Sequence, residues 1–139
     1  MDQAVLVNQQ FPDEMYNEGQ SFLSSIDKQG VRVIDALWRK SKDQSQWSFY
    51  ITVRDFNKLG PLYFFTRIQK IFKKEVFKHI RTSNIQIAPE ENPYIRMISS
   101  IITTNGSVSR IEFFTNYLNG MEMDDLVIYK IGKKKPNKR

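Results

Sequence analysis

The spacing of apolar residues changes at Gly30, from the three- and four-residue steps of a helix to the alternation of a strand. Before this glycine, apolar residues follow Pro12 at helical spacing, which predicts a helix over about residues 13–28 that ends at Gly30. After it, the segment from Val31 to Trp38 is apolar on both faces, as is typical of a strand in the middle of a sheet. A helix followed by such a strand indicates a layered structure in which helices cover a sheet.

The strand from Val31 is followed by a polar turn and by a second strand, over about residues 47–53, in which large apolar side chains alternate with polar ones. Together the two strands predict an antiparallel hairpin. Pro61 can stand in the first turn of a helix without losing a hydrogen bond, so we expect a helix over about residues 61–79. Helical spacing predicts its buried stripe: Phe65, Ile68, Phe72 and Val76.

Three further elements are expected in the second half of the chain. Residues 85–87 predict a short strand. Asn92 and Pro93 suit the N-cap and first turn of a helix, although the β-branched content of that segment leaves a strand as the alternative. A hairpin is then expected, with an alternating first strand over residues 111–118, its turn at Asn119-Gly120 and a closing strand over about residues 126–131 that is apolar on both faces.

The length and the order of these elements predict an α+β fold. A chain of 139 residues, of which 40% are hydrophobic, is long enough for one core and too short for two. We expect a single domain over residues 1–131, with a mostly antiparallel sheet of about five strands and about three helices packed largely on one face. Residues 132–139 are expected to form a basic C-terminal tail.

Composition excludes several classes of protein. The sequence has no cysteine, which excludes disulfides, thiolate metal sites and a cysteine nucleophile, and which suits a reducing compartment. No stretch approaches the ~18 consecutive apolar residues of a membrane span, and the first residues do not resemble a secretory signal. The scattered glycines form no phosphate-binding loop or dinucleotide fingerprint. We therefore expect a cytoplasmic protein without a membrane span, and no cofactor.

The net charge is placed unevenly along the chain. The formal net charge is +6, and the basic residues of the last ten positions account for all of it, because the rest of the chain is balanced. A second basic region lies in the helix expected over residues 61–79, on the side opposite to its apolar stripe. The residues of this stripe are Arg67, Lys70, Lys74, Lys78 and Arg81, with Lys73 beside them, and those of the tail are Lys133, Lys134, Lys135, Lys138 and Arg139.

These two basic regions are the candidate binding site for nucleic acid. Cations at regular steps along a helix can meet successive phosphates, and a flexible cationic tail adds attraction to any polyanion. Gln69 is the one side chain interleaved with the stripe that is suited to reading bases, so we expect little sequence preference. The sequence thus favours a non-enzymatic accessory or regulatory module that binds nucleic acid phosphates, and the alternative for the helix is an ordinary solvated face.

A protein-interaction subunit is the second hypothesis, either a homodimer or a module with an acidic partner. Acidic segments flank the basic middle of the chain, and its 10 Phe, 6 Tyr and 2 Trp exceed what a core of this size must contain. Tyrosines offered for such a surface are Tyr16, Tyr50, Tyr63, Tyr94 and Tyr117.

A metal-dependent nuclease or hydrolase is the third hypothesis, and the least favoured. Asp35 is unusual in an apolar strand, where an unpaired charge is costly, and we expect it to pair with Arg54 or with another residue of the adjacent strand. With Asp55 and a lysine, either Lys40 or Lys58, it could hold a metal ion. His79, the only histidine of the chain, is expected to pack and cap the basic helix rather than to catalyse.

Overall fold

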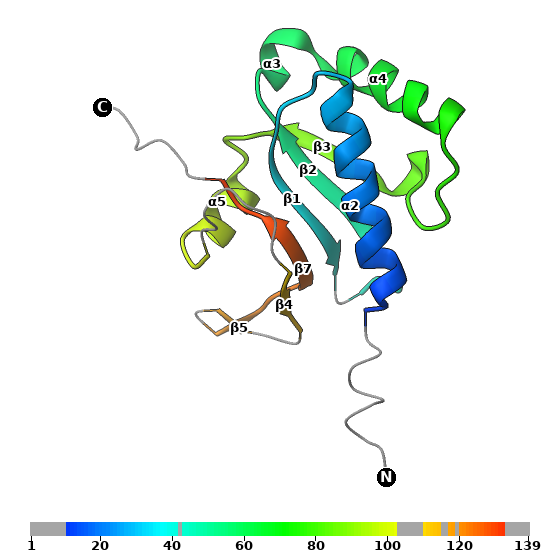
Figure 1. Cartoon of the computed structure of the whole chain (residues 1–139). Helices are drawn as coiled ribbons and strands as arrows, with labels where there is room; N and C mark the ends of the chain where they lie inside the picture. The colour runs from blue at the N-terminus through cyan, green and yellow to red at the C-terminus, as the bar shows by residue number, and fades with distance from the viewer. Residues whose placement is uncertain (1–10, 42, 103–109, 115–116, 119, 133–139) are drawn as a thin grey trace.

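The computed structural model describes residues 11–41, 43–102, 110–114, 117–118 and 120–132 (Figure 1). In chain order, its elements are α2 (Asp13–Lys28), β1 (Val33–Lys40), β2 (Ser48–Val53), α3 (Phe56–Leu59), α4 (Pro61–Lys74), a 3-10 turn (Thr82–Asn84), β3 (Ile85–Pro89), α5 (Pro93–Ser99), β4 (Ile111–Phe113), β5 (Tyr117–Leu118), β6 (Met121–Glu122) and β7 (Asp125–Lys130). The predicted α+β fold is confirmed.

The main sheet has five strands in the order β3-β2-β1-β7-β4. The strand expected to be central, β1, is in the middle, and it pairs antiparallel with both β2 and β7. Strand β3 pairs with β2 in parallel, so the sheet is mixed rather than purely antiparallel. A parallel neighbour needs a crossover connection, and α3 and α4 supply it between β2 and β3.

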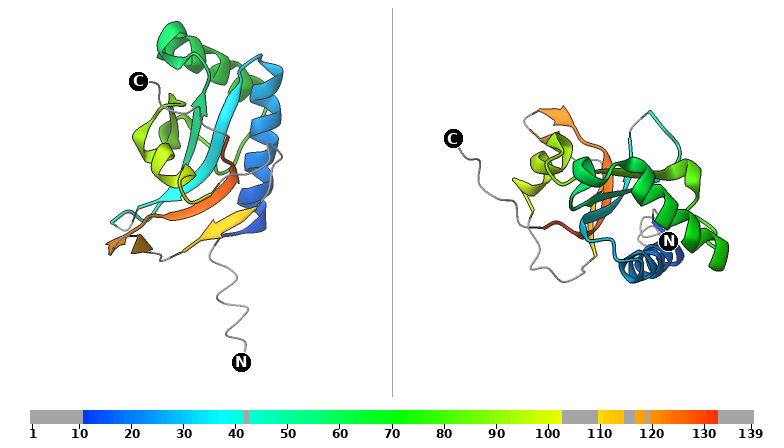
Figure 2. Two further views of the ribbon diagram at one scale, coloured as in Figure 1. Left: turned by 90° about the vertical axis from the view of Figure 1, so that its left-hand side faces the viewer. Right: turned by 90° about the horizontal axis from the view of Figure 1, so that it is seen from above.

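Helices cover both faces of this sheet. Figures 1 and 2 show α2 and α4 on one side and α5 on the other. The core beneath α2 and α4 is largely aromatic, with Phe22, Trp38 and Phe49 fully buried, whereas α5 packs through Ile95 on Leu37 and its neighbours. The expected grouping of helices on one face thus holds for α2, α3 and α4, since Phe56 of α3 also packs on the aromatic core, but not for α5. Strand β2, expected to be amphipathic, is buried on both faces because α5 covers the second one.

A chain of hydrogen bonds crosses the aromatic core between the sheet and α2. The indole Nε1 of Trp38 donates to the Tyr129 hydroxyl over 3.0 Å, and this hydroxyl donates to the carbonyl oxygen of Tyr16 over 2.7 Å. Burial raises the pKa of Tyr129, so its hydroxyl stays protonated and can donate. Gly19 permits the close approach, because a Cβ at this position would lie 1.8 Å from the Tyr129 hydroxyl oxygen.

Helix α4 ends earlier than its apolar spacing predicts. The expected helix over residues 61–79 stops at Lys74, and Val76, expected in the buried stripe, is 99% exposed. The buried residues of α4 are Phe64, Ile68 and Ile71, a stripe that fits helical spacing as well as the predicted one does. The helix ends because the segment after it is bound to α2: the Glu18 carboxylate accepts hydrogen bonds from the backbone N–H groups of residues 78, 79 and 80.

The last third of the chain departs in part from the expected hairpin. Strand β7 is buried on both faces and pairs antiparallel with β4, as the predicted hairpin requires. The hairpin is interrupted, however, because β5 and β6 pair with each other in a separate two-stranded sheet, on either side of the predicted turn. Of the predicted turn, Gly120 has a positive φ of 80°, and Asn119 lies outside the described residues. Helix α5 begins as predicted, since the Asn92 side chain accepts from the backbone N–H groups of Tyr94 and Ile95. None of the described helices combines the length and the hydropathy that crossing a bilayer requires.

Candidate functional site

The end of α4 divides the predicted basic stripe into two parts. Arg67, Lys70, Lys73 and Lys74 lie on α4, whereas Lys78 and Arg81 lie in the segment that follows it. The tail residues Lys133, Lys134, Lys135, Lys138 and Arg139 lie outside the described residues. The stripe is therefore not one continuous helix face, and its two parts have different surroundings.

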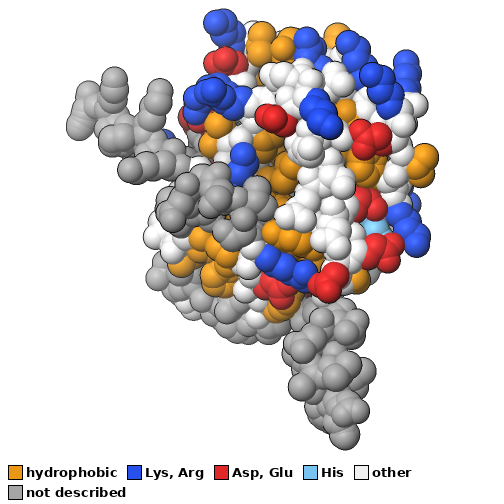
Figure 3. All heavy atoms as spheres, viewed as in Figure 1, with side chains coloured by type: hydrophobic (Ala, Val, Ile, Leu, Met, Phe, Trp, Pro, Cys, Tyr) orange, Lys and Arg blue, Asp and Glu red, His pale blue; other side chains and the backbone are white. Residues whose placement is uncertain are grey.

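Three lysines at the end of α4 are open to solvent. Lys70, Lys73 and Lys74 are exposed, and none of them forms an ion pair with any carboxylate in the described part of the chain. Figure 3 shows Lys and Arg side chains gathered along the upper edge of the molecule, over α3 and α4. Arg81 is also exposed, and it lines the same hollow beside α4 as Gln69 and the C-cap residue Glu75, so the segment after the helix returns this cation to the side of α4. We call Lys70, Lys73, Lys74 and Arg81 the α4 cationic surface.

Two members of the predicted stripe are already engaged. The guanidinium of Arg67 lies 3.5 Å from the ring centroid of Tyr63, and its Nη1 donates to the Tyr63 carbonyl oxygen over 3.2 Å. Such stacking keeps the positive charge but fixes the side chain against the helix. The ammonium of Lys78 lies 3.3 Å from Oε2 of Glu14. The usable cationic surface is thus smaller than the sequence predicts.

Two carboxylates of α2 bind the segment that follows α4. Glu14 Oε2 lies 3.1 Å from Nε2 of His79, which follows α4 rather than lying on it. The hydrogen bond from His79, and next the interaction with Lys78, lower the pKa of Glu14. Glu18 lies one turn further along α2 and holds three backbone N–H groups of the same segment. His79 therefore packs against an acid and helps to fix this segment.

The carboxylates of the nuclease hypothesis are kept apart by their surroundings. Asp35 is fully buried, accepts hydrogen bonds from Thr52 Oγ1 and, over 2.8 Å, from the backbone N–H of Gly132. Its partner on the adjacent strand is thus Thr52, and Arg54 pairs instead with Glu90. Asp55 is exposed, in the turn before α3. The described residues contain no group of three or more His, Cys, Asp or Glu side chains that could hold a metal ion.

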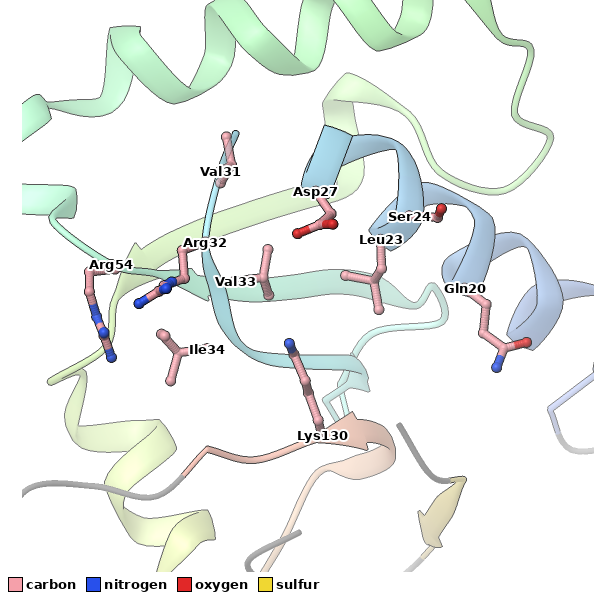
Figure 4. A pocket seen from close by; sticks show the side chains of 10 residues that line it. All are labelled: Gln20, Leu23, Ser24, Asp27, Val31, Arg32, Val33, Ile34, Arg54 and Lys130. Carbon is pink, nitrogen blue, oxygen red and sulfur yellow. The ribbon is translucent and has the colours of Figure 1, made fainter. Parts of the chain in front are cut away.

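A groove beside α2, which sequence reasoning missed, is the other candidate site. It has a volume of about 600 Å³ and lies between α2, the start of β1 and the end of β7. Figure 4 shows its floor of Val33 and Ile34 from β1, its wall with Leu23 from α2, and Lys130 reaching into it from β7. We call this site the α2 groove.

Two irregularities in strand pairing form the α2 groove. The pairing of β1 with β2 skips Ile34, and the pairing of β1 with β7 skips Tyr129, while Ala36 still pairs with Lys130. An extra residue of this kind bends its strand and breaks the alternation of faces, so consecutive side chains can point to one side. Tyr129 thus packs beneath α2 while the next residue, Lys130, lines the groove. A prediction that relies on strict alternation cannot find such a site.

The α2 groove carries more positive than negative charge. Arg32, Arg54 and Lys130 line it together with a single carboxylate, that of Asp27. Arg54 is held by Glu90, whereas Arg32 and Lys130 form no ion pair within the described residues. The last described residue, Gly132, lies beside β1, where its backbone N–H donates to the Asp35 carboxylate.

The aromatic surplus is used mostly inside the domain. Tyr16 and Tyr50, offered above for a partner surface, are 8% and 6% exposed, and Tyr63 and Tyr94 are half-buried. The side chain of Tyr117 lies outside the described residues.

Known proteins supply no further assignment for these surfaces. Comparisons of the chain with protein-family models, with curated proteins and with solved structures find no match.

Proposed function

We propose that this protein is a non-enzymatic accessory module that binds the phosphates of nucleic acids, with little sequence preference, through the α4 cationic surface. The observation that carries the proposal is that Lys70, Lys73 and Lys74 are exposed and form no ion pair within the described part of the chain. Such lysines keep counterions and water in the free protein, and a phosphate backbone that replaces the counterions releases them. Phosphate contacts position a protein on nucleic acid without reading its sequence.

The spacing of these lysines suits a phosphate backbone. From Lys70 to Lys74 the helix advances about 6 Å, at ~1.5 Å per residue. Each strand of a DNA duplex presents about one phosphate charge per 3.4 Å of the duplex axis, so the long side chains of these lysines can reach neighbouring phosphates of one strand. Arg81 extends the surface beside the helix end. Because this surface has few groups that could read base edges, binding is expected to depend on charge far more than on sequence.

With Arg67 and Lys78 engaged elsewhere, we expect the α4 cationic surface to bind nucleic acid with modest affinity. Arg67 is stacked on Tyr63 and Lys78 is paired with Glu14, so about four cations remain for phosphate. With a slope of about −0.9 per phosphate contacted, the logarithm of the binding constant should fall with the logarithm of salt concentration at about −3 to −4. Contacts from the tail would steepen this slope.

Salt-dependent titration of a fluorescent 20-base-pair duplex and of a single strand tests the proposal. We expect Lys70→Gln/Lys74→Gln to reduce the slope by about 2, since each lost phosphate contact removes about 0.9. The matched control is Lys28→Gln/Lys58→Gln, which removes the same charge from exposed positions on α2 and α3. Equal losses from both variants would mean that net charge alone attracts the nucleic acid, and would contradict a site on α4.

Self-association is the second candidate function, favoured by one observation. Leu62 is 78% exposed and Leu59 is 42% exposed, and both lie where α3 meets α4. Sedimentation over a wide concentration range tests it, because a homodimer that uses this corner should weaken in Leu62→Gln. A monomer at every concentration would remove this candidate.

We also propose a cytoplasmic location. A chain without cysteine gains nothing from an oxidising compartment and must be stabilised by packing alone.

A further inference from the structure

The α2 groove has the size and lining of a small-molecule site. Its volume of about 600 Å³ falls in the range of about 300–1,000 Å³ that is typical of ligand pockets. Leu23 on one wall and Val33 and Ile34 on the floor give it an apolar surface. Ligand sites commonly combine such a surface with a few polar groups that fix the orientation of the ligand.

The charged groups of the groove select for an anion. Lys130 is half-buried, and in Figure 4 its ammonium points from β7 into the space between β1 and α2. Arg32 lies at the rim, exposed, and neither cation forms an ion pair within the described residues. A partly desolvated ammonium is stabilised by a charge-assisted hydrogen bond to an anionic group, which makes Lys130 the anchor.

The opposite wall supplies neutral polar groups. Gln20 and Ser24, one helical turn apart on α2, line the groove beside Leu23, and Asp27 lies one turn further on. A ligand with a second negative charge far from the first would place that charge near the Asp27 carboxylate, which repels it. A compact ligand with one anionic group therefore fits the lining best. Gln20 and Ser24 can each offer one hydrogen bond to such a body.

We propose that the α2 groove binds a small organic anion with an apolar body, such as an aromatic carboxylate. Its carboxylate would lie against Lys130, with Arg32 adding positive potential at the rim, and its body would lie on Leu23, Val33 and Ile34. This site does not include the α4 cationic surface, so the inference stands or falls separately from nucleic acid binding.

Two probes that differ in charge alone test the inference: naphthalene-2-carboxylate and its neutral amide, naphthalene-2-carboxamide. Each is titrated into the full chain while the methyl NMR signals of Leu23, Val31, Val33 and Ile34 are followed. We expect the carboxylate to shift these methyl signals saturably and to bind several-fold more tightly than the amide. Lys130→Gln should weaken the carboxylate about three- to fivefold, the range for one partly exposed charge pair, and leave the amide unchanged.

A control and a second variant keep the test decisive. Lys74→Gln, on the exposed face of α4, should leave carboxylate binding unchanged. If Lys130→Gln does not fold, Arg32→Gln at the exposed rim replaces it, with a smaller loss expected. Equal binding of acid and amide, methyl shifts outside the groove, or equal losses from Lys74→Gln and the groove variant would each overturn the inference.

Discussion

Replacing Gly19 with alanine should destabilise the domain, although alanine is the better helix former. Gly19 lies inside α2, where this change ordinarily stabilises by about 1 kcal/mol. Here the added Cβ would lie 1.8 Å from the hydroxyl oxygen of Tyr129 and 2.5 Å from its Cζ. The ring cannot swing away, because Tyr129 is fully buried and its hydroxyl is bonded to both Trp38 and Tyr16.

The size of the effect follows from three contributions. Forcing an extra carbon into a packed core costs about 1–3 kcal/mol. Displacing the Tyr129 hydroxyl removes two buried hydrogen bonds, each worth about 1 kcal/mol. Subtracting the helix propensity that alanine gains leaves a net loss of about 2–4 kcal/mol in the free energy of unfolding.

Urea unfolding, followed by circular dichroism, measures this loss. At an ordinary dependence on denaturant, the midpoint should fall by about 1–2 M. Ser21→Ala, at an exposed position of the same helix, reports propensity without the clash and should change the midpoint little. A Gly19→Ala variant as stable as the wild type, or more so, would refute the close packing of α2 on Tyr129.

Three further outcomes are expected. Glu18→Ala should speed amide hydrogen exchange at residues 78–80, since their N–H groups lose the carboxylate that binds them, and should leave exchange in β1 unchanged. Glu14, whose pKa is lowered in the folded state, should contribute stability above its ordinary pKa of 4.5 that is lost as the pH falls further, and Glu14→Gln should flatten this part of the pH profile measured by thermal unfolding. A chain that ends at Gly132 should bind the duplex more weakly and with a shallower salt slope, while an unchanged slope would exclude the tail from the interface.

The elements that the sequence predicts well are those that depend on local signals. Helix α2 and the β1–β2 hairpin follow from apolar spacing alone, and Asn92 marks the start of α5 because a cap acts on the next residues. The end of α4 depends instead on Glu18, which is 60 residues or more away in the chain from the N–H groups that it binds. No local pattern contains that contact.

The residues of the candidate sites also differ in whether local signals predict them. Lys70 and Lys74 are predicted correctly as exposed cations, because a helix period places them opposite the buried stripe. The pairing of Lys78 with Glu14 requires the packing of α2 beside the segment after α4, and the α2 groove requires strand bulges. Both are properties of register and tertiary contact, which spacing along one segment does not encode.

The acids of this chain pair with some cations and not with others. This explains how a domain whose positive and negative charges cancel can carry a cationic surface. Several acids of the described residues are engaged by cations with structural roles: Arg110 binds Asp13 and Glu112, and Arg54 binds Glu90. Removing Asp13 or Glu112 would therefore release Arg110 and would not change the cationic surface itself. Because the lysines at the end of α4 and Lys130 in the α2 groove are not engaged in this way, anionic ligands should compete for these two places first.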